Sequence, residues 1–191
     1  MTLNLPNILT LLRIALIPVF VVLFYLPVEW SSLAATIVFG AAAWTDWFDG
    51  YLARRMKLTS AFGAFLDPVA DKLMVAVALV LLVDNNPTPY AGFFLAIPAG
   101  VIIGREIVIS ALREWMSELG ERAEVAVSVI GKIKTATQML ALVLLLYREP
   151  IGGFPIVETG FVFLYISAVL TLWSMVIYLR ASWPAMQKEN D

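Results

Sequence analysis

The chain has 191 residues, of which 61% are hydrophobic and only 15% charged, and its formal net charge is −2. A soluble domain of this size is about half apolar and about a quarter charged, so much of the surface must face lipid instead of water. The acidic balance excludes a basic nucleic-acid surface, and the absence of cysteine and histidine excludes thiol nucleophiles, disulfides, zinc fingers and histidine triads.

Apolar stretches separated by short polar breaks predict an all-α integral membrane protein with about six transmembrane helices in one domain, residues 1–191. The segment Met1–Pro6 lacks the basic residues and cleavage site of a signal peptide, so we expect the first apolar stretch to remain as a membrane helix. In chain order, the predicted spans are Ile8–Val28, Ser32–Leu52, Val69–Val83, Ala91–Leu112, Val125–Tyr147 and Ile156–Leu179.

The positions of lysine and arginine predict the orientation in the membrane, because loops on the cytoplasmic side carry an excess of both. With the N-terminus inside, the opposite side carries Arg148 alone. Both termini are then inside, as an even number of spans requires. The residues at or near the cytoplasmic side are Arg54, Arg55, Lys57, Arg113, Arg122, Arg180 and Lys188.

Four aspartates lie in or beside the second and third predicted spans. Asp46 and Asp49 are three residues apart, and Asp67 and Asp71 are four apart, so each pair shares one face of a helix. An unpaired charge at such a depth costs about 2.5–3.5 kcal/mol or more, and four neighbouring carboxylates cannot all stay ionised without cations between them. Ligand sets made only of oxygen favour Mg²⁺, Mn²⁺ or Ca²⁺, and a pair of such ions suits phosphoryl chemistry.

Small and basic residues accompany the aspartates. Gly50 and Gly63 leave room beside the acids for a bulky ligand or another helix. Arg54, one turn beyond Gly50, can hold a phosphate with its planar guanidinium.

Each aspartate also has a purely structural interpretation. Asp67, which precedes Pro68, has the pattern of a helix N-cap followed by proline in the first turn. Asp46 or Asp49 could instead pair with Arg54 or Lys72. The set of four at this spacing favours a functional site, since intramembrane acids are usually functional.

The same residues form a pattern, D-x2-D-G-x2-A-R-x8-G-x3-D-x3-D, by which the chain resembles the CDP-alcohol phosphatidyltransferase family. It is matched in full by Asp46, Asp49, Gly50, Ala53, Arg54, Gly63, Asp67 and Asp71. The resemblance implies six transmembrane helices with a site near the cytoplasmic face, where two Mg²⁺ or Mn²⁺ ions hold the diphosphate of a CDP-linked lipid such as CDP-diacylglycerol. An alcohol attacks the β-phosphorus and CMP leaves.

The resemblance also implies roles for single residues. Asp46, Asp49 and Asp67 would bind the metal ions, and Asp71 would both contact metal and act as the base. The residues expected to contact the CDP group are Gly50, Arg54, Ser60 and, more weakly, Asn7 and Thr10.

Cations in the fourth and fifth predicted spans bear on the acceptor alcohol. They are as costly in the membrane as the acids, so they should converge on an anionic ligand or on partner acids. The stretches Arg105–Gly120 and Val125–Gln138, with Asn4–Thr10 and Leu172–Ser174, resemble bacterial members of the family that use glycerol 3-phosphate. The resemblance implies four phosphate ligands: Arg105, Arg113, Lys132 and Lys134.

These cations have a structural interpretation as well. Lys132 and Arg113 could extend to the membrane interface, and Arg105 could pair with Glu106 or Glu114.

Other functions stay open at this point. A cardiolipin or phosphatidylinositol-phosphate type of synthase would share the motif. An ion-coupled transporter would also use intramembrane acids, although no paired broken segments indicate an inverted repeat. A non-enzymatic scaffold would leave the acids without a purpose. The resemblance implies a bacterial inner membrane, and a homodimer is compatible with it.

Overall fold

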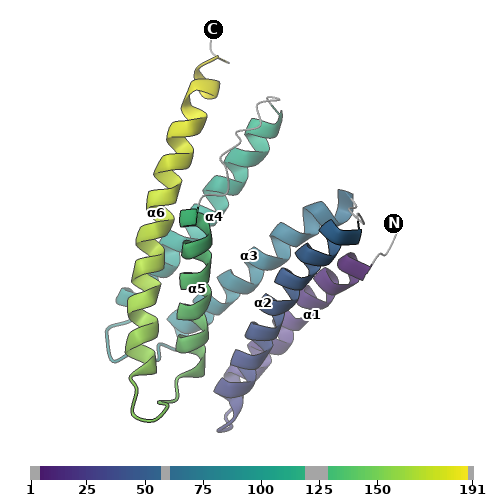
Figure 1. Ribbon diagram of the computed structural model, residues 1–191. Coiled ribbons are helices and arrows are strands. Elements are labelled where there is room, and N and C mark those ends of the chain that lie inside the picture. Colours follow the sequence, from purple (N-terminus) through teal and green to yellow (C-terminus); the bar gives the residue numbers. More distant parts are fainter. Residues whose placement is uncertain (1–4, 57–60, 119–128, 189–191) are drawn as a thin grey trace.

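The computed structural model describes residues 5–56, 61–118 and 129–188, and these ranges form six helices (Figure 1). The prediction of an all-α integral membrane protein with about six helices is confirmed. The helices are α1 (Leu5–Tyr25), α2 (Ser31–Met56), α3 (Ala61–Asp84), α4 (Phe93–Glu118), α5 (Val129–Tyr147) and α6 (Ile156–Lys188).

Length and composition make this a membrane protein. Within the described residues, three segments are each long and apolar enough to cross a bilayer: Asn7–Tyr25, Phe93–Ser117 and Ile156–Trp183. Ser31–Thr45 of α2 is a shorter apolar stretch. Large apolar side chains such as Ile37 and Val169 are about three-fifths exposed, which indicates a surface in contact with lipid.

The third helix begins earlier than its apolar pattern predicts. α3 starts at Ala61, so Pro68 lies inside the helix. The interpretation of Asp67 as a helix N-cap is therefore wrong: the pair Asp67-Pro68 has the pattern of a helix start but lies inside a helix that begins about two turns earlier. Gly63, Asp67 and Asp71 now follow one another at helical spacing, as the shared-face interpretation requires.

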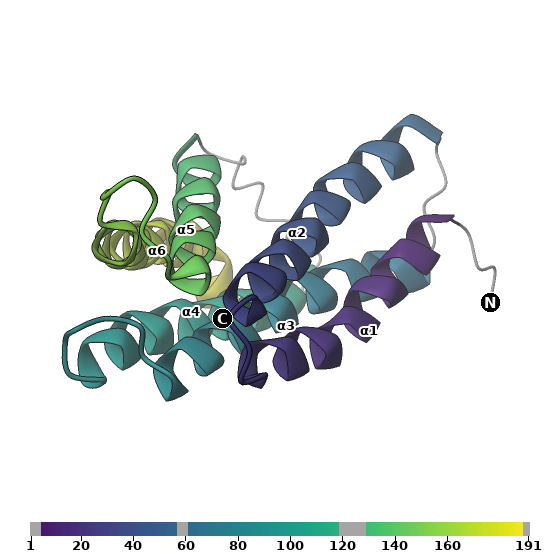
Figure 2. The ribbon, with the colours of Figure 1, turned by 90° about the horizontal axis from the view of Figure 1, so that it is seen from below.

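The six helices form two groups (Figures 1 and 2). α1 packs on α2 and α3, and α6 packs on α4 and α5, while α2 and α3 join the groups through contacts with α5 and α4. The backbones of α4 and α5 do not pack together along their described lengths. In Figure 1 the groups lie close at one end and diverge towards the end at which α1 begins and α6 stops.

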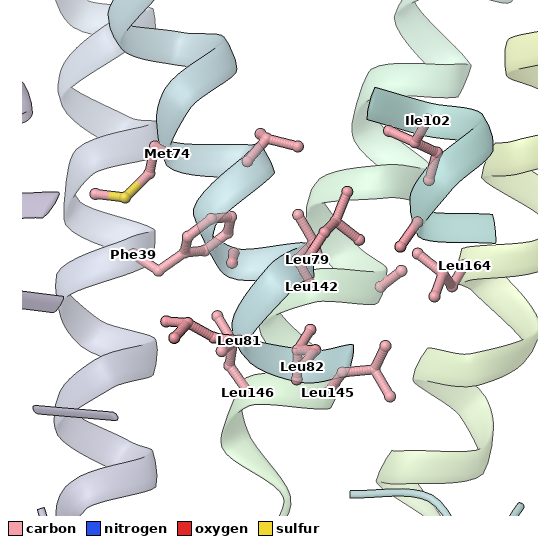
Figure 3. Packing of buried hydrophobic residues seen from close by; sticks show 14 of the residues in the cluster. Phe39, Met74, Leu79, Leu81, Leu82, Ile102, Leu142, Leu145, Leu146 and Leu164 are labelled. Atoms are coloured by element: carbon pink, nitrogen blue, oxygen red, sulfur yellow. The ribbon is translucent and has the colours of Figure 1, made fainter. Parts of the chain in front are cut away.

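The close end is filled by leucine (Figure 3). Leu79 and Leu82 of α3 meet Leu142 and Leu145 of α5, and all four are fully buried. Gly160 lets α6 approach α5, because a Cβ atom there would lie only 2.9 Å from Leu144 Cβ. This end is a dry, interdigitated core that holds the helices in register.

Candidate active site

At the divergent end, α3, α4, α5 and α6 enclose a cavity of about 320 Å³. Four cations and two acids face it, so its formal charge is positive. Its polar lining consists of Asp71, Lys72, Arg105, Glu106, Arg113, Lys134, Thr135, Gln138, Ser174 and Tyr178.

One carboxylate organises the middle of the cavity. Oε1 of Glu106 accepts from Lys134 Nζ at 2.6 Å and from Arg105 Nη1 at 3.1 Å. The Lys134 and Arg105 side chains are only 9% and 10% exposed, so both cations are held away from bulk water. Since α4 and α5 do not pack directly, the Lys134–Glu106 pair connects them across the hollow.

Two further hydrogen bonds tie these cations to neighbouring helices. Arg105 Nη2 donates to Ser174 Oγ on α6 at 3.0 Å. On the α3 side, Lys72 donates to the Ser110 hydroxyl, which donates to the backbone oxygen of Glu106. The network therefore spans α3, α4, α5 and α6 and positions three cations around one acid.

Arg113 lies nearer the divergent end. Its Nε donates to the Tyr178 hydroxyl at 3.2 Å, and its Cζ lies 5.2 Å from the centre of the tyrosine ring. Arg113 is mainly exposed, whereas Tyr178 is buried. A cation held in this way at the rim can contact both water and a ligand in the cavity.

Asp71 is placed between two cavities. Besides the main cavity, it lines a much smaller one with Arg13 of α1 and Ala42 of α2, and Val75 and Met139 also line both. Asp71 therefore lies where the α1–α3 group meets the cationic hollow.

The four aspartates lie on two helices that pack together. Asp46 and Asp49 belong to α2, and Asp67 and Asp71 to α3. Ala42, which lines the smaller cavity together with Asp71, lies one helical turn before position 46, so these two positions are on the same side of α2.

Several predicted residues have side chains outside the described part of the chain. Among the described residues, no cluster of acids is large enough to hold a metal ion. The ligand set predicted from the motif thus stays a prediction, as do the expected contacts to the CDP group. The predicted residues outside the description, in side chain or entirely, are Asp46, Asp49, Gly50, Arg54, Ser60 and Asp67.

Of the remaining predicted residues, some line the main cavity and others do not. Arg105, Arg113 and Lys134 line the cavity, whereas Lys132 is exposed and does not. The ion pair of Arg105 with Glu106, expected from the structural interpretation, is confirmed. Asn7 and Thr10 are buried on α1 and line neither cavity, at 3% and 0% exposed.

Sequence reasoning missed several cavity residues. Arg13 is only 2% exposed in the middle of an apolar helix, and the rule that identified the aspartates as intramembrane charges also applies to it. Gln138 and Ser174 are polar residues in apolar stretches, a weaker signal. Tyr178 carries no signal in sequence, because an aromatic residue in a membrane helix usually packs or faces lipid.

Comparison with known proteins gives agreement over nearly the whole chain. The sequence profile of the CDP-alcohol phosphatidyltransferase family matches residues 3–173. A CDP-diacylglycerol–glycerol-3-phosphate 3-phosphatidyltransferase of Pseudomonas fluorescens is 56% identical over 188 residues, covering 98% of this chain and 94% of the relative. Proteins of the same name from Yersinia pestis (strain Pestoides F) and Escherichia coli (strain K12) are 55% and 54% identical, over 96% and 95% of this chain and 97% and 96% of the relatives.

Proposed function

The chain belongs to the CDP-alcohol phosphatidyltransferase family, and from this premise we propose that it transfers the phosphatidyl group of CDP-diacylglycerol to glycerol 3-phosphate. The products are phosphatidylglycerophosphate and CMP, a step in the synthesis of anionic phospholipids. The observation that carries the choice of acceptor is the cavity lined by four cations and two acids, one of which is Asp71. A small dianion matches its charge.

The acceptor phosphate would bind among the cavity cations. Lys134 is buried and Arg105 is partly buried, and both already share one carboxylate. The buried Nε of Arg105 makes no hydrogen bond to any described residue. Arg113 at the rim would meet the incoming phosphate first. Lys132, on the exposed face of α5, would act only through its longer-range charge.

The aspartate positions fit a pair of divalent ions. Their ligands would be Asp46, Asp49, Asp67 and Asp71, which offer only oxygen donors from two packed helices, the donor type preferred by Mg²⁺ and Mn²⁺. When bound, such ions would neutralise the diphosphate and the charge that develops on the leaving CMP. Gly50, Arg54 and Ser60, with Asn7 and Thr10 of α1, would contact the CDP group.

The reaction itself is one substitution at phosphorus. The terminal hydroxyl oxygen of glycerol 3-phosphate forms a bond to the β-phosphorus of CDP-diacylglycerol, the bond from that phosphorus to the CMP oxygen breaks, and Asp71 takes the hydroxyl proton. The placement of Asp71 on both cavities supports this role, because the base must reach the acceptor while facing the donor. Lys134 and Arg105 would hold the acceptor phosphate so that its hydroxyl stays near Asp71.

We also propose the orientation and location. The excess of lysine and arginine at the divergent end predicts that this end and both termini face the cytoplasm of a bacterial inner membrane. Glycerol 3-phosphate would then enter from the cytoplasm through the rim at Arg113. Reaction of a membrane-impermeant reagent with cysteines introduced at Tyr90 and at Arg180 tests this orientation, since only the first should react from the periplasm.

The function is tested with purified protein in detergent, CDP-diacylglycerol, Mg²⁺ and a panel of separate acceptors: glycerol 3-phosphate, serine, inositol phosphate and phosphatidylglycerol. We expect CMP release with glycerol 3-phosphate alone, and its loss when a chelator is added. Release with phosphatidylglycerol or inositol phosphate instead would assign the cardiolipin or phosphatidylinositol-phosphate type. No release with any acceptor would favour the transporter interpretation.

A further inference from the structure

The innermost polar residue of the main cavity on α5 is Gln138. It lies four residues, one helical turn, beyond Lys134 and faces the same cavity. Gln138 is only 5% exposed, and its buried Oε1 atom has no hydrogen-bond partner among the described residues. A buried amide oxygen without a hydrogen-bond donor is costly in an apolar helix, which indicates that a donor from outside the described residues satisfies it.

The neighbours of Gln138 limit what that partner is. Val75 and Met139 add apolar side chains to the lining of the same cavity, and Lys134 lies one helical turn nearer the start of α5, on the side of the divergent end. An anion would therefore bind before reaching the amide. A neutral hydroxyl suits it, because an amide can both accept from and donate to a hydroxyl in either orientation of its oxygen and nitrogen.

We infer that Gln138 recognises the middle, non-reacting hydroxyl of the acceptor and thereby determines specificity for a glycerol backbone. This inference rests on the proposed function, since it takes glycerol 3-phosphate as the acceptor. With the phosphate at Lys134 and the terminal hydroxyl at Asp71, the three-carbon chain lies between α5 and α3, and its middle hydroxyl faces the amide. One helical turn, about 5.4 Å, separates Lys134 from Gln138, a distance that a three-carbon chain can bridge.

The test compares two acceptors that differ only in this hydroxyl: glycerol 3-phosphate and 3-hydroxypropyl phosphate. The unsubstituted protein should prefer glycerol 3-phosphate in kcat/KM by about tenfold or more, because a site that binds a hydroxyl rejects an analogue without it. Gln138→Met, which keeps the side-chain length, should reduce that preference to about one- to twofold, mainly by losing activity with glycerol 3-phosphate. The KM for CDP-diacylglycerol should not change.

Thr171→Val is the matched control. Thr171 is also fully buried and its Oγ1 also lacks a partner within the described ranges, but it does not line the cavity. This variant should keep the preference of the unsubstituted protein. Gln138→Asn, which keeps the amide on a shorter side chain, should give an intermediate preference and serves as the second variant if Gln138→Met does not fold.

The outcomes are distinct. An unchanged preference in Gln138→Met or in Gln138→Asn, or equal losses with both acceptors, would overturn the role of Gln138 while leaving the proposed function intact. Absence of any preference in the unsubstituted protein would also overturn it. No CMP release by the unsubstituted protein with glycerol 3-phosphate would refute the proposed function, and this inference with it.

Discussion

α3 and α5 pack tightly together towards one end and enclose a polar cavity towards the other. Towards one end, Leu79 and Leu82 interlock with Leu142 and Leu145, and all are fully buried. Towards the other, the same two helices carry charged and amide side chains and leave a cavity of about 320 Å³.

The difference teaches how a hollow can persist in a membrane protein. Inside a bilayer, apolar helix surfaces already face lipid instead of water, so the hydrophobic effect contributes little to helix association. The helices associate through close packing and polar contacts instead. The leucine end supplies the packing, and Gly160 brings α5 and α6 together there. The rigid packing at the leucine end thus keeps the helices apart at the other end, and the ion pair of Lys134 with Glu106 connects α5 to α4 across the cavity.

The sharpest test of the contrast is Asp71→Asn, at the hollow end. Because the substitution removes the proposed base and keeps the shape, kcat should fall by about a hundredfold or more, with thermal stability nearly unchanged. CMP release and a melting curve in detergent measure the two effects, and CDP-diacylglycerol binding should be largely kept. Near-normal turnover would contradict the role of Asp71.

Leu145→Ala, at the packed end, should lower stability and leave turnover nearly unchanged. Truncating this fully buried side chain should lower the free energy of unfolding by about 2–5 kcal/mol, because the lost contacts leave a void between α5 and its neighbours. Turnover by the protein that stays folded should be close to normal. Leu140→Ala, at a 44% exposed position of the same helix, is the control and should change stability far less.

Lys134→Ala and Lys132→Ala test whether the cavity, and not the charge of α5 as a whole, binds the acceptor. Loss of the buried Lys134 should raise the KM for glycerol 3-phosphate by about tenfold or more, with little change for CDP-diacylglycerol, because a charge-assisted bond contributes about 1.5–3 kcal/mol. Loss of the exposed Lys132 should have a smaller effect. Equal increases for both substrates would argue against an acceptor site around Lys134.

Gly160→Ala should have the smallest effect of these substitutions. The added methyl group would lie 2.9 Å from Leu144 Cβ and 3.2 Å from the Leu145 backbone nitrogen, so α5 and α6 must move apart. We expect a loss of about 1–3 kcal/mol in unfolding free energy. Gly100→Ala in α4, where nothing lies within 4 Å, should be neutral or slightly stabilising, and similar losses in both variants would refute the close-packing explanation.

The sequence predicted the number of helices because short polar breaks separate the apolar stretches, although only three of the described helices are long and apolar enough to be recognised as spans by composition alone. It placed the start of α3 too late, since Asp67 and Pro68 interrupt an apolar stretch that is helical on both sides of them. Charge in an apolar stretch identified Arg105 and Lys134, and the structure adds that they face one cavity whereas Lys132 does not.

The partners of these cations could not be predicted so well. Arg105 pairs with Glu106, its neighbour in sequence, but Lys134 reaches the same carboxylate from another helix. Such a contact depends on how α3 and α6 position α4 and α5 relative to each other. The periodicity of a single helix in the sequence does not predict this arrangement. Gln138 was missed for the same reason, because one polar residue shows its environment only after the helices are assembled.

The length of α5 has a consequence for the membrane around the protein. Its 19 residues span about 28 Å, close to the roughly 30 Å of a bilayer's hydrocarbon, whereas the 33 residues of α6 span about 50 Å. Lys134 lies only five residues after the first described residue of α5, so we expect it to lie close to the lipid headgroups. A thicker bilayer would draw this end of α5 into hydrocarbon, and we expect turnover to decline in vesicles of long-chain lipids as hydrophobic mismatch grows.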